Sequence, residues 1–230
     1  MYDKASVVYW RAMKLEMGPE EKRDLYISRA ETYLAGKNYE SADILLNHLR
    51  RVYKGKPVIG NIYFLSAKLR ENQGKEKSAL EFYERAVSES FCYKEKRAEF
   101  AERYLRLLKK QGELKKFSEE LERFRKGKWL ENERLQYWYV CLGDYYRKLD
   151  KPTKAGEAYR VALADSMPGD NKMIQKASLY YGDVQLALGN VEEAVDLHKK
   201  ALSGPDQILT RIARQRLEED EMTRSMSEVE

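Results

Sequence analysis

Small and bulky apolar residues alternate along the chain at the three- and four-residue spacings of amphipathic helices. The same order of small and bulky positions returns in successive stretches, and one small position in each stretch serves as a ruler. This ruler position is occupied by Ala42, Ala79, Phe117, Ala155 and Ala194. The spacings between them are 37, 38, 38 and 39 residues. A regular period over five stretches predicts a tandem array in which each unit is a pair of antiparallel helices.

Three stretches carry the pattern most fully. They contain Tyr63, Ala67, Ala79, Tyr83 and Ala86; Tyr139, Gly143, Ala155, Tyr159 and Ala162; and Ser178, Gly182, Ala194, His198 and Ala201. This order resembles the tetratricopeptide repeat (TPR), W-x2-L-G-x2-Y…A-x3-F-x2-A, and the stretch from Gln136 to Pro168 is the closest match. The resemblance implies an all-α fold: a right-handed α-α superhelix, or solenoid, of about five TPR helix pairs, with an additional N-terminal helix and a C-terminal capping helix.

The repeat frame gives boundaries for a single solenoid domain over residues 1–230. We expect a helix of a partial repeat over 3–17, a capping helix over 206–220, a tail over 221–230, and repeats over 23–56, 60–93, 98–130, 136–168 and 175–205. In the third repeat, Phe117 and Phe124 replace small residues, so its two helices are expected to splay or shift. The first helix matches only the second half of a repeat, which fits either a piece of a longer protein or a natural capping helix.

Turn residues support the frame. Four glycines fall at the turn between the two helices of a repeat, where a helix C-cap is expected, and Asp150 holds that place in the fifth repeat. The glycines are Gly36, Gly74, Gly112 and Gly189. Pro152 can open the second helix of its repeat, because proline is tolerated in the first helical turn.

Composition narrows the class of protein. The chain has 230 residues, of which 35% are charged and 43% hydrophobic, with 17 tyrosines. No run of about 18 to 20 apolar residues is present, so no membrane helix is predicted. The net charge of +5 is uneven: residues 94–128 hold 13 basic and 7 acidic residues. No signal peptide is visible, and the expected location is the cytoplasm, with a membrane tether only through a segment absent from this chain.

Residues that could carry chemistry are sparse. The two histidines, His48 and His198, are 150 residues apart and both fall on second helices, where they are interpreted as packing residues. The two cysteines, Cys92 and Cys141, fit no metal-binding spacing and are interpreted as unpaired small hydrophobes, with a disulfide between them as the alternative. No catalytic or phosphate-binding motif occurs. The sequence therefore predicts a protein that is not an enzyme, with no cofactor, no metal site and no small-molecule substrate.

The resemblance implies a binding surface on the concave face, which first helices line in this family. The lining positions there form a basic middle with aromatic anchors, which suits an acidic or amphipathic peptide or helix. The candidate groove residues are Phe64, Lys68, Arg106, Lys109, Tyr137, Asp144 and Arg147. The Lys and Asn pair with which one subfamily grips the C-terminal carboxylate of chaperones is missing, so a chaperone-tail co-chaperone is disfavoured.

The leading hypothesis is a non-catalytic scaffold that docks a peptide or helix of another protein in this groove. Bacterial proteins resembling it often assemble envelope, pilus or exopolysaccharide-secretion machinery, which is an analogy with the family. The alternative is an RNA-binding helical repeat that uses the basic stretch over 94–128, although nucleic acid is not the favoured partner. Self-association is a further hypothesis, through apolar surface at the N-terminal end near Tyr2 to Trp10.

Overall fold

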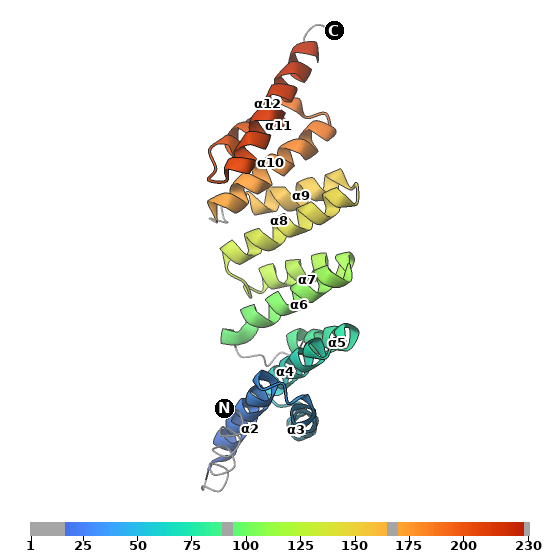
Figure 1. Ribbon diagram of the computed structural model, residues 1–230, viewed down its shortest axis with the longest axis vertical. Helices are drawn as coiled ribbons and strands as arrows, with labels where there is room; N and C mark the ends of the chain where they lie inside the picture. Colours follow the sequence, from blue (N-terminus) through green and yellow to red (C-terminus); the bar gives the residue numbers. More distant parts are fainter. Residues whose placement is uncertain (1–16, 89–93, 165–169, 228–230) are drawn as a thin grey trace. The chain divides into compact units, whose positions relative to one another are not determined.

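The computed structural model describes residues 17–88, 94–164 and 170–227, which form eleven α-helices and no strand (Figure 1). The helices follow the predicted repeats as consecutive pairs and a final helix. They are α2 (Pro19–Ala35), α3 (Tyr39–Val52), α4 (Ile59–Asn72), α5 (Glu76–Ser88), α6 (Arg97–Gln111), α7 (Leu114–Lys126), α8 (Asn132–Lys148), α9 (Pro152–Ala162), α10 (Asn171–Ala187), α11 (Val191–Leu202) and α12 (Gln207–Ser227). The predicted all-α helical repeat is confirmed. The helix predicted over 3–17 lies outside the described residues except for Met17, and Cys92 also lies outside them.

The chain divides into two compact units, Met1–Glu120 and Leu121–Glu230. A single solenoid domain over 1–230 stays a prediction. Their boundary lies inside α7, the second helix of the repeat in which Phe117 and Phe124 replace small residues. In the first unit, α2 packs against α3 and α4 against α5, while α3 and α5 contact the next helix along the chain. In the second unit, α8 with α9, α10 with α11, and α11 with α12 form the same arrangement.

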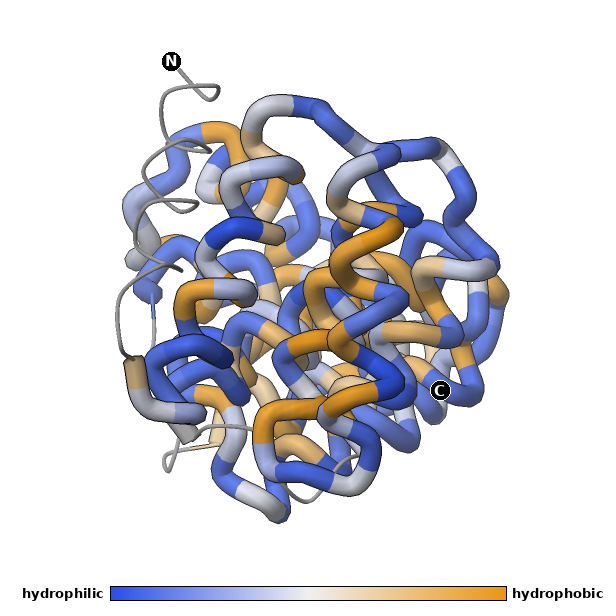
Figure 2. The backbone as a smooth tube through the Cα atoms, turned by 90° about the horizontal axis from the view of Figure 1, so that it is seen from below, coloured by the Kyte–Doolittle hydropathy of each residue, from blue (hydrophilic) through white to orange (hydrophobic). Residues whose placement is uncertain are grey.

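Each unit buries an apolar core between its helices, and apolar and polar residues are interleaved along the helices (Figure 2). The ruler positions Ala42, Ala79, Phe117, Ala155 and Ala194 are all buried. His198 is fully buried, as its packing position predicted, whereas His48 lies on the exposed face of α3. The packing role predicted for His48 is therefore wrong, because its neighbours Leu46 and Leu49 alone turn toward the core.

The closest helix approach within a repeat depends on a residue without a side chain. A Cβ atom placed on Gly143 of α8 would lie 2.6 Å from the Tyr159 ring of α9. A Cβ atom on Gly182 of α10 would lie 2.4 Å from Nε2 of His198 on α11. The small position of the first helix therefore receives the bulky residue of the second helix, as the repeat pattern indicated. This contact sets the distance between the two helices of a pair.

The turn inside each pair uses a left-handed residue at one fixed place. Three glycines take positive φ there, and the equivalent residues in the other two repeats are Lys37 and Asp150, with φ of 58° and 53°. The prediction of Gly36 as the cap of the first repeat is off by one residue, because Gly36 has φ of −80° and Lys37 is left-handed. The backbone geometry of the turn is thus kept even where the residue is not glycine.

The last helix runs to Ser227, past the predicted end of the capping helix at 220. An ion pair between Arg224 on α12 and Glu192 on α11, 3.3 Å long, holds the extra turns against the preceding helix. The hydroxyls of Thr223 and Ser225 also donate to the carbonyl oxygens of Glu219 and Glu221, four residues earlier. Helical structure therefore covers much of the segment for which a tail was predicted.

We expect Gly143→Ala to lower the free energy of unfolding of the second unit by about 2 kcal/mol, because the added methyl group overpacks the Tyr159 contact. Alanine otherwise favours a helix interior by about 1 kcal/mol over glycine, so the opposite sign would be seen without the clash. Urea unfolding followed by tryptophan fluorescence measures this, since Trp129 and Trp138 belong to the second unit. In a Tyr159→Leu background the same substitution should be neutral or stabilising; an equal loss in both backgrounds contradicts the packing argument.

Candidate functional site

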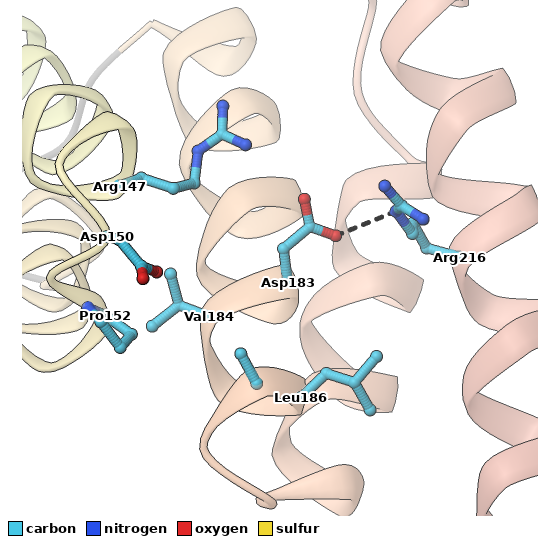
Figure 3. Close-up of a pocket in the computed structure, with 8 residues that line it drawn as sticks. Arg147, Asp150, Pro152, Asp183, Val184, Leu186 and Arg216 are labelled. Atoms are coloured by element: carbon cyan, nitrogen blue, oxygen red, sulfur yellow. Dashed lines mark ion pairs between the residues drawn. The ribbon is translucent and has the colours of Figure 1, made fainter.

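A pocket opens in the second unit between α8, α10 and α12 (Figure 3). Its volume is about 390 Å³. Four charged residues line it: Arg147 in the last turn of α8, Asp150 in the turn that follows, Asp183 on α10, and Arg216 on α12. The apolar part of the wall comes from Pro152 and the C-terminal half of α10. That part of α10 contributes Val184, Leu186 and Ala187.

Repeat geometry explains why these side chains meet. Arg147, Asp183 and Leu186 occupy positions that the TPR frame assigns to the lining of the concave face. Helix α10 contacts both α8 and α12, so its outward residues lie between residues of those two helices. In Figure 3, Asp183 lies between Arg147 on one side and Arg216 on the other.

The two arginines of the pocket differ in their partners. Arg216 is held by two carboxylates: its Nε lies 3.1 Å from Oδ1 of Asp183, and its Nη1 lies 2.8 Å from Oε2 of Glu219. The hydrogen bond that Arg216 donates to Glu219, followed by the charge of Asp183, raises the pKa of Arg216. Arg147 has no ion pair with a carboxylate among the described residues. It forms a side-chain hydrogen bond with Tyr159, and its guanidinium lies 4.0 Å from the centroid of the Tyr180 ring. Arg147 is therefore the exposed cation that can receive an anionic group.

Asp183 belongs to a polar arrangement that occurs twice in the second unit. In the preceding repeat, Asp144 follows Gly143 as Asp183 follows Gly182. The hydroxyl of Tyr159 donates to Oδ1 of Asp144 at 2.7 Å, and Nζ of Lys176 from α10 lies 2.5 Å from Oδ2 of Asp144. Burial, together with the Asp144 charge, raises the pKa of Tyr159. Each aspartate thus joins its own repeat to a cation from the next first helix or from α12.

The first unit contains a related contact, displaced by about one helical turn along the inner face. The hydroxyl of Tyr83 donates to Oε2 of Glu71 at 2.7 Å, and Nη1 of Arg103 from α6 lies 3.9 Å from the same oxygen. Lys68 occupies the place that corresponds to Asp144, so the carboxylate comes from the following turn of α4. The arrangement is preserved although the residue position changes.

The structure places the predicted groove residues of the first unit unevenly. Phe64 is only 4% exposed and stacks on Phe100 with ring centroids 4.0 Å apart, so it packs between helices and offers no free ring as an anchor. The reason is the close spacing of α4 and α6 at that level. Lys68 is half-buried with Nζ 5.6 Å from the Phe64 ring centroid. Arg106 and Lys109 are exposed on α6.

In the second unit, Tyr137 is 44% exposed and meets the Trp138 ring edge-on. Asp144 is occupied by its contacts with Tyr159 and Lys176, so it acts inside the protein and not as an open groove residue. Of the predicted residues, Arg147 is the one that lines the pocket. Sequence reasoning missed Arg216. A signal was present in the two repeats, since Lys176 follows Asp144 by 32 residues and Arg216 follows Asp183 by 33 residues.

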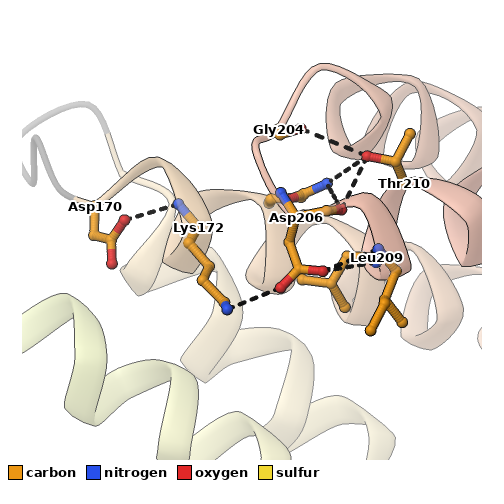
Figure 4. Close-up of polar contacts among 8 residues, drawn as sticks. Asp170, Lys172, Gly204, Asp206, Leu209 and Thr210 are labelled. Atoms are coloured by element: carbon orange, nitrogen blue, oxygen red, sulfur yellow. Dashed lines mark hydrogen bonds and ion pairs between the residues drawn. The ribbon is translucent and has the colours of Figure 1, made fainter.

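Helix α12, which supplies Arg216, begins in a set of polar contacts around Asp206 and Thr210 (Figure 4). A buried amide attaches it to α10. Gln175 is 1% exposed, and its Nε2 lies within 3.1 Å of three acceptors: the carbonyl oxygens of Ala201 and Asp206 and Oγ1 of Thr210. Its Oε1 accepts the backbone N–H of Asp206 at 2.8 Å. One side chain therefore connects the end of α11 to the beginning of α12.

Asp206 then caps α12. Its Oδ1 accepts the backbone N–H groups of Ile208 and Leu209, which a helix N-terminus leaves without partners. Nζ of Lys172 lies 2.8 Å from Oδ2 of Asp206, and this contact lowers the pKa of Asp206. These contacts fix where α12 starts and so where Arg216 lies.

Comparisons with known proteins agree with the helical-repeat fold. The family model described as Tetratricopeptide repeat protein 21 ARM repeat matches residues 9–119. BtubC from P. vanneervenii has a TM-score of 0.56 at 19% identity, covering 87% of this chain and 87% of that one. YrrB, described as a TPR protein, has a TM-score of 0.56 at 17% identity, covering 90% and 97%. The chain has the fold of tetratricopeptide-repeat proteins.

Pseudomonas aeruginosa PilF is a further structural neighbour of this chain, with a TM-score of 0.50 at 17% identity, covering 90% and 92% of the two chains. A comparison with curated proteins gave no match. The TPR fold is typical of protein-interaction scaffolds without catalytic activity. None of the described helices is both long and apolar enough to cross a membrane. Within the described residues, no group of three His, Cys, Asp or Glu is placed to hold a metal ion.

We expect Gln175→Leu to destabilise the second unit by about 3 kcal/mol, because several buried backbone and side-chain partners lose their hydrogen bonds together. Urea unfolding followed by tryptophan fluorescence measures the change. Gln207→Leu is the matched control, since Gln207 is exposed in the first turn of α12 and should change stability by less than about 0.5 kcal/mol. Equal effects of the two substitutions would show that Gln175 does not anchor α12.

Proposed function

We propose that this TPR scaffold holds a partner protein by a short segment that carries an acidic group next to aliphatic side chains, and that the pocket between α8, α10 and α12 receives this segment. The observation that carries the proposal is the composition of the pocket. An arginine without a carboxylate partner lies beside a wall of Pro152, Val184 and Leu186. This combination suits a carboxylate and an apolar side chain close together.

The arrangement favours recognition at low entropic cost. Arg147 rests against the ring of Tyr180, and Arg216 is held in place by Asp183 and Glu219. A preformed site loses little side-chain freedom on binding, so more of the interaction energy appears as affinity. The guanidinium of Arg147 can bind a carboxylate with two parallel hydrogen bonds.

Four other residues of the predicted groove extend the proposal beyond the pocket. Tyr137 in the second unit, and Lys68, Arg106 and Lys109 in the first unit, are proposed to contact further parts of the partner. Phe64 and Asp144 are left out of this contact surface because they take part in packing and internal ion pairs. Among the structural neighbours, YrrB is described as having an unusual peptide-binding site, which supports a peptide as the kind of ligand.

A scaffold of this kind acts as an adaptor or assembly component, and we propose the cytoplasm as its location. Its mechanism needs no chemical step. The partner segment docks on a preformed inner surface, and a few anchor contacts provide most of the affinity.

The test is a selection from a random peptide display library with wild-type protein at about 150 mM salt, an ionic strength at which screening leaves close charge pairs effective. We expect enriched peptides to carry Asp or Glu, or a free C-terminal carboxylate, within two residues of an aliphatic side chain. Synthetic versions should bind Arg147→Glu about tenfold or more weakly than wild type, because the charge reversal repels the acidic group.

Lys148→Glu is the matched control, since it makes the same charge change at the next residue of α8, outside the pocket. Its affinity should stay within about twofold of wild type, because a charge away from the contact acts mainly through screened long-range fields. Equal affinities of both variants would move the site away from this pocket. Enrichment of peptides without acidic groups would refute the proposed chemistry of the partner.

A further inference from the structure

A buried histidine connects the last three helices next to the pocket. His198 on α11 and Asp220 on α12 are both fully buried, and Nδ1 of His198 lies 2.5 Å from Oδ2 of Asp220. Nε2 of His198 lies 3.1 Å from the carbonyl oxygen of Leu179 and 3.6 Å from Oδ1 of Asp183, both on α10. Neither residue belongs to the wall of the pocket, but Asp183 does.

The geometry has a consequence for the protons of the ring. A neutral imidazole has one donor nitrogen and one acceptor nitrogen. Here each ring nitrogen faces an oxygen that accepts hydrogen bonds, a carboxylate on one side and a backbone carbonyl on the other. Both contacts are satisfied when both nitrogens carry a proton, which makes the ring a cation.

The charged groups around the ring favour that form. Asp183 faces it from α10, and Asp220 faces it from α12. Arg216 and Glu219 of α12 form an ion pair with each other, and Arg216 also pairs with Asp183. Two carboxylates therefore face His198 directly, and the nearest cation already has two carboxylate partners.

Burial alone would lower the pKa of His198, but the hydrogen bonds and charges of Asp183 and Asp220 outweigh burial and raise it above its ordinary value of 6.5. The ring has no room to move away on the side of α10, because Gly182 contacts it closely. A charged and confined ring of this kind can hold two helices by their carboxylates.

We propose that His198 is a positioning residue of the pocket: as an imidazolium it ties Asp220 of α12 and Asp183 of α10 to α11, and so places Arg216 and makes the pocket depend on pH. Loss of the proton leaves the carboxylate of Asp220 buried without a cation and removes one counterion of Asp183. Helix α12 then opens more readily, and Arg216 moves with it.

The direction of the pH effect follows from linkage. When α12 opens, His198 returns to an ordinary pKa near 6.5, while the closed form keeps a raised pKa. The contribution to stability is complete below pH 6.5 and is lost as pH rises from there through the raised pKa. In that window the opening equilibrium of α12 increases by at most about tenfold per pH unit, the change expected for one proton.

The first experiment reads the proton state directly in the whole chain by nitrogen-15 NMR of the imidazole rings at pH 7. Only two histidines are present, so a His48→Gln variant assigns the spectrum. We expect both ring nitrogens of His198 to show protonated shifts, and its titration midpoint to lie above 6.5. An unprotonated Nδ1 or Nε2 at pH 7, including a neutral pair with a protonated Asp220, would overturn the proposal.

The second experiment measures protection of α12 amides by hydrogen exchange from pH 6 to 9, normalised to intrinsic rates. Protection over 207–227 should fall with rising pH in wild type, while α9 serves as an internal reference. His198→Gln should remove this pH dependence, and His48→Gln should keep it. If wild-type α12 shows no fall in protection across the raised pKa, the proposal fails, whatever happens to the variant.

The link to binding rests on the proposed function, whereas the proton state and the attachment of α12 do not. A peptide selected for the pocket should bind wild type more weakly above the raised pKa and bind His198→Gln with no such change. Normal proton linkage in α12 with pH-independent peptide affinity would refute the coupling to the pocket alone. If the selection yields no peptide, the proposed function is contradicted. The NMR and hydrogen-exchange experiments then still decide whether His198 is charged and attaches α12.

Discussion

The fold depends on a contact between a residue that has almost no side chain and one that has a large one. Gly143 receives the ring of Tyr159, and Gly182 receives the ring of His198. Because the first helix offers a gap at this level, the second helix can approach closely, and the bulky ring fills the space between them. The tip of that ring then reaches the next carboxylate of the first helix. Packing and polar contacts are thus produced by one pair of residues.

That pair also connects neighbouring repeats. The carboxylate that faces the ring, Asp144 or Asp183, accepts a cation from the following helix, Lys176 or Arg216. Apolar packing holds two helices together within a repeat, and the aspartate extends the connection to a third. The inner face is consequently built from side chains that are already paired, and an exposed cation such as Arg147 stands out against them. This contrast is what gives the pocket a defined chemistry.

Much of the architecture could be predicted because the repeat imposes the same packing demand in every unit. The ruler alanines are buried, and His198 holds the predicted packing position. The repeat pattern did not predict the role of every single residue. Lys37, and not Gly36, takes the left-handed turn, since the frame fixes the backbone place and not the residue type. His48 is exposed because a helix position next to two core residues can still turn outward.

The candidate site was only partly predictable. The repeat frame identified Arg147 as a lining residue. It also identified Phe64, but Phe64 stacks on Phe100 and is buried. The distance between consecutive first helices decides whether a lining residue is exposed or packed, and that distance cannot be read from the sequence. Arg216 was missed because α12 lies outside the repeat, where the frame no longer assigns positions.

The origin of Arg216 has a consequence for how such an array evolves. The pocket takes one of its walls from α12, whose sequence the repeat frame does not constrain. Substitutions on the side of α12 that faces the pocket can therefore change what the pocket binds without altering the small and bulky positions that hold the helix pairs together. The packing of the repeats and the specificity of the pocket can vary independently in a chain built this way.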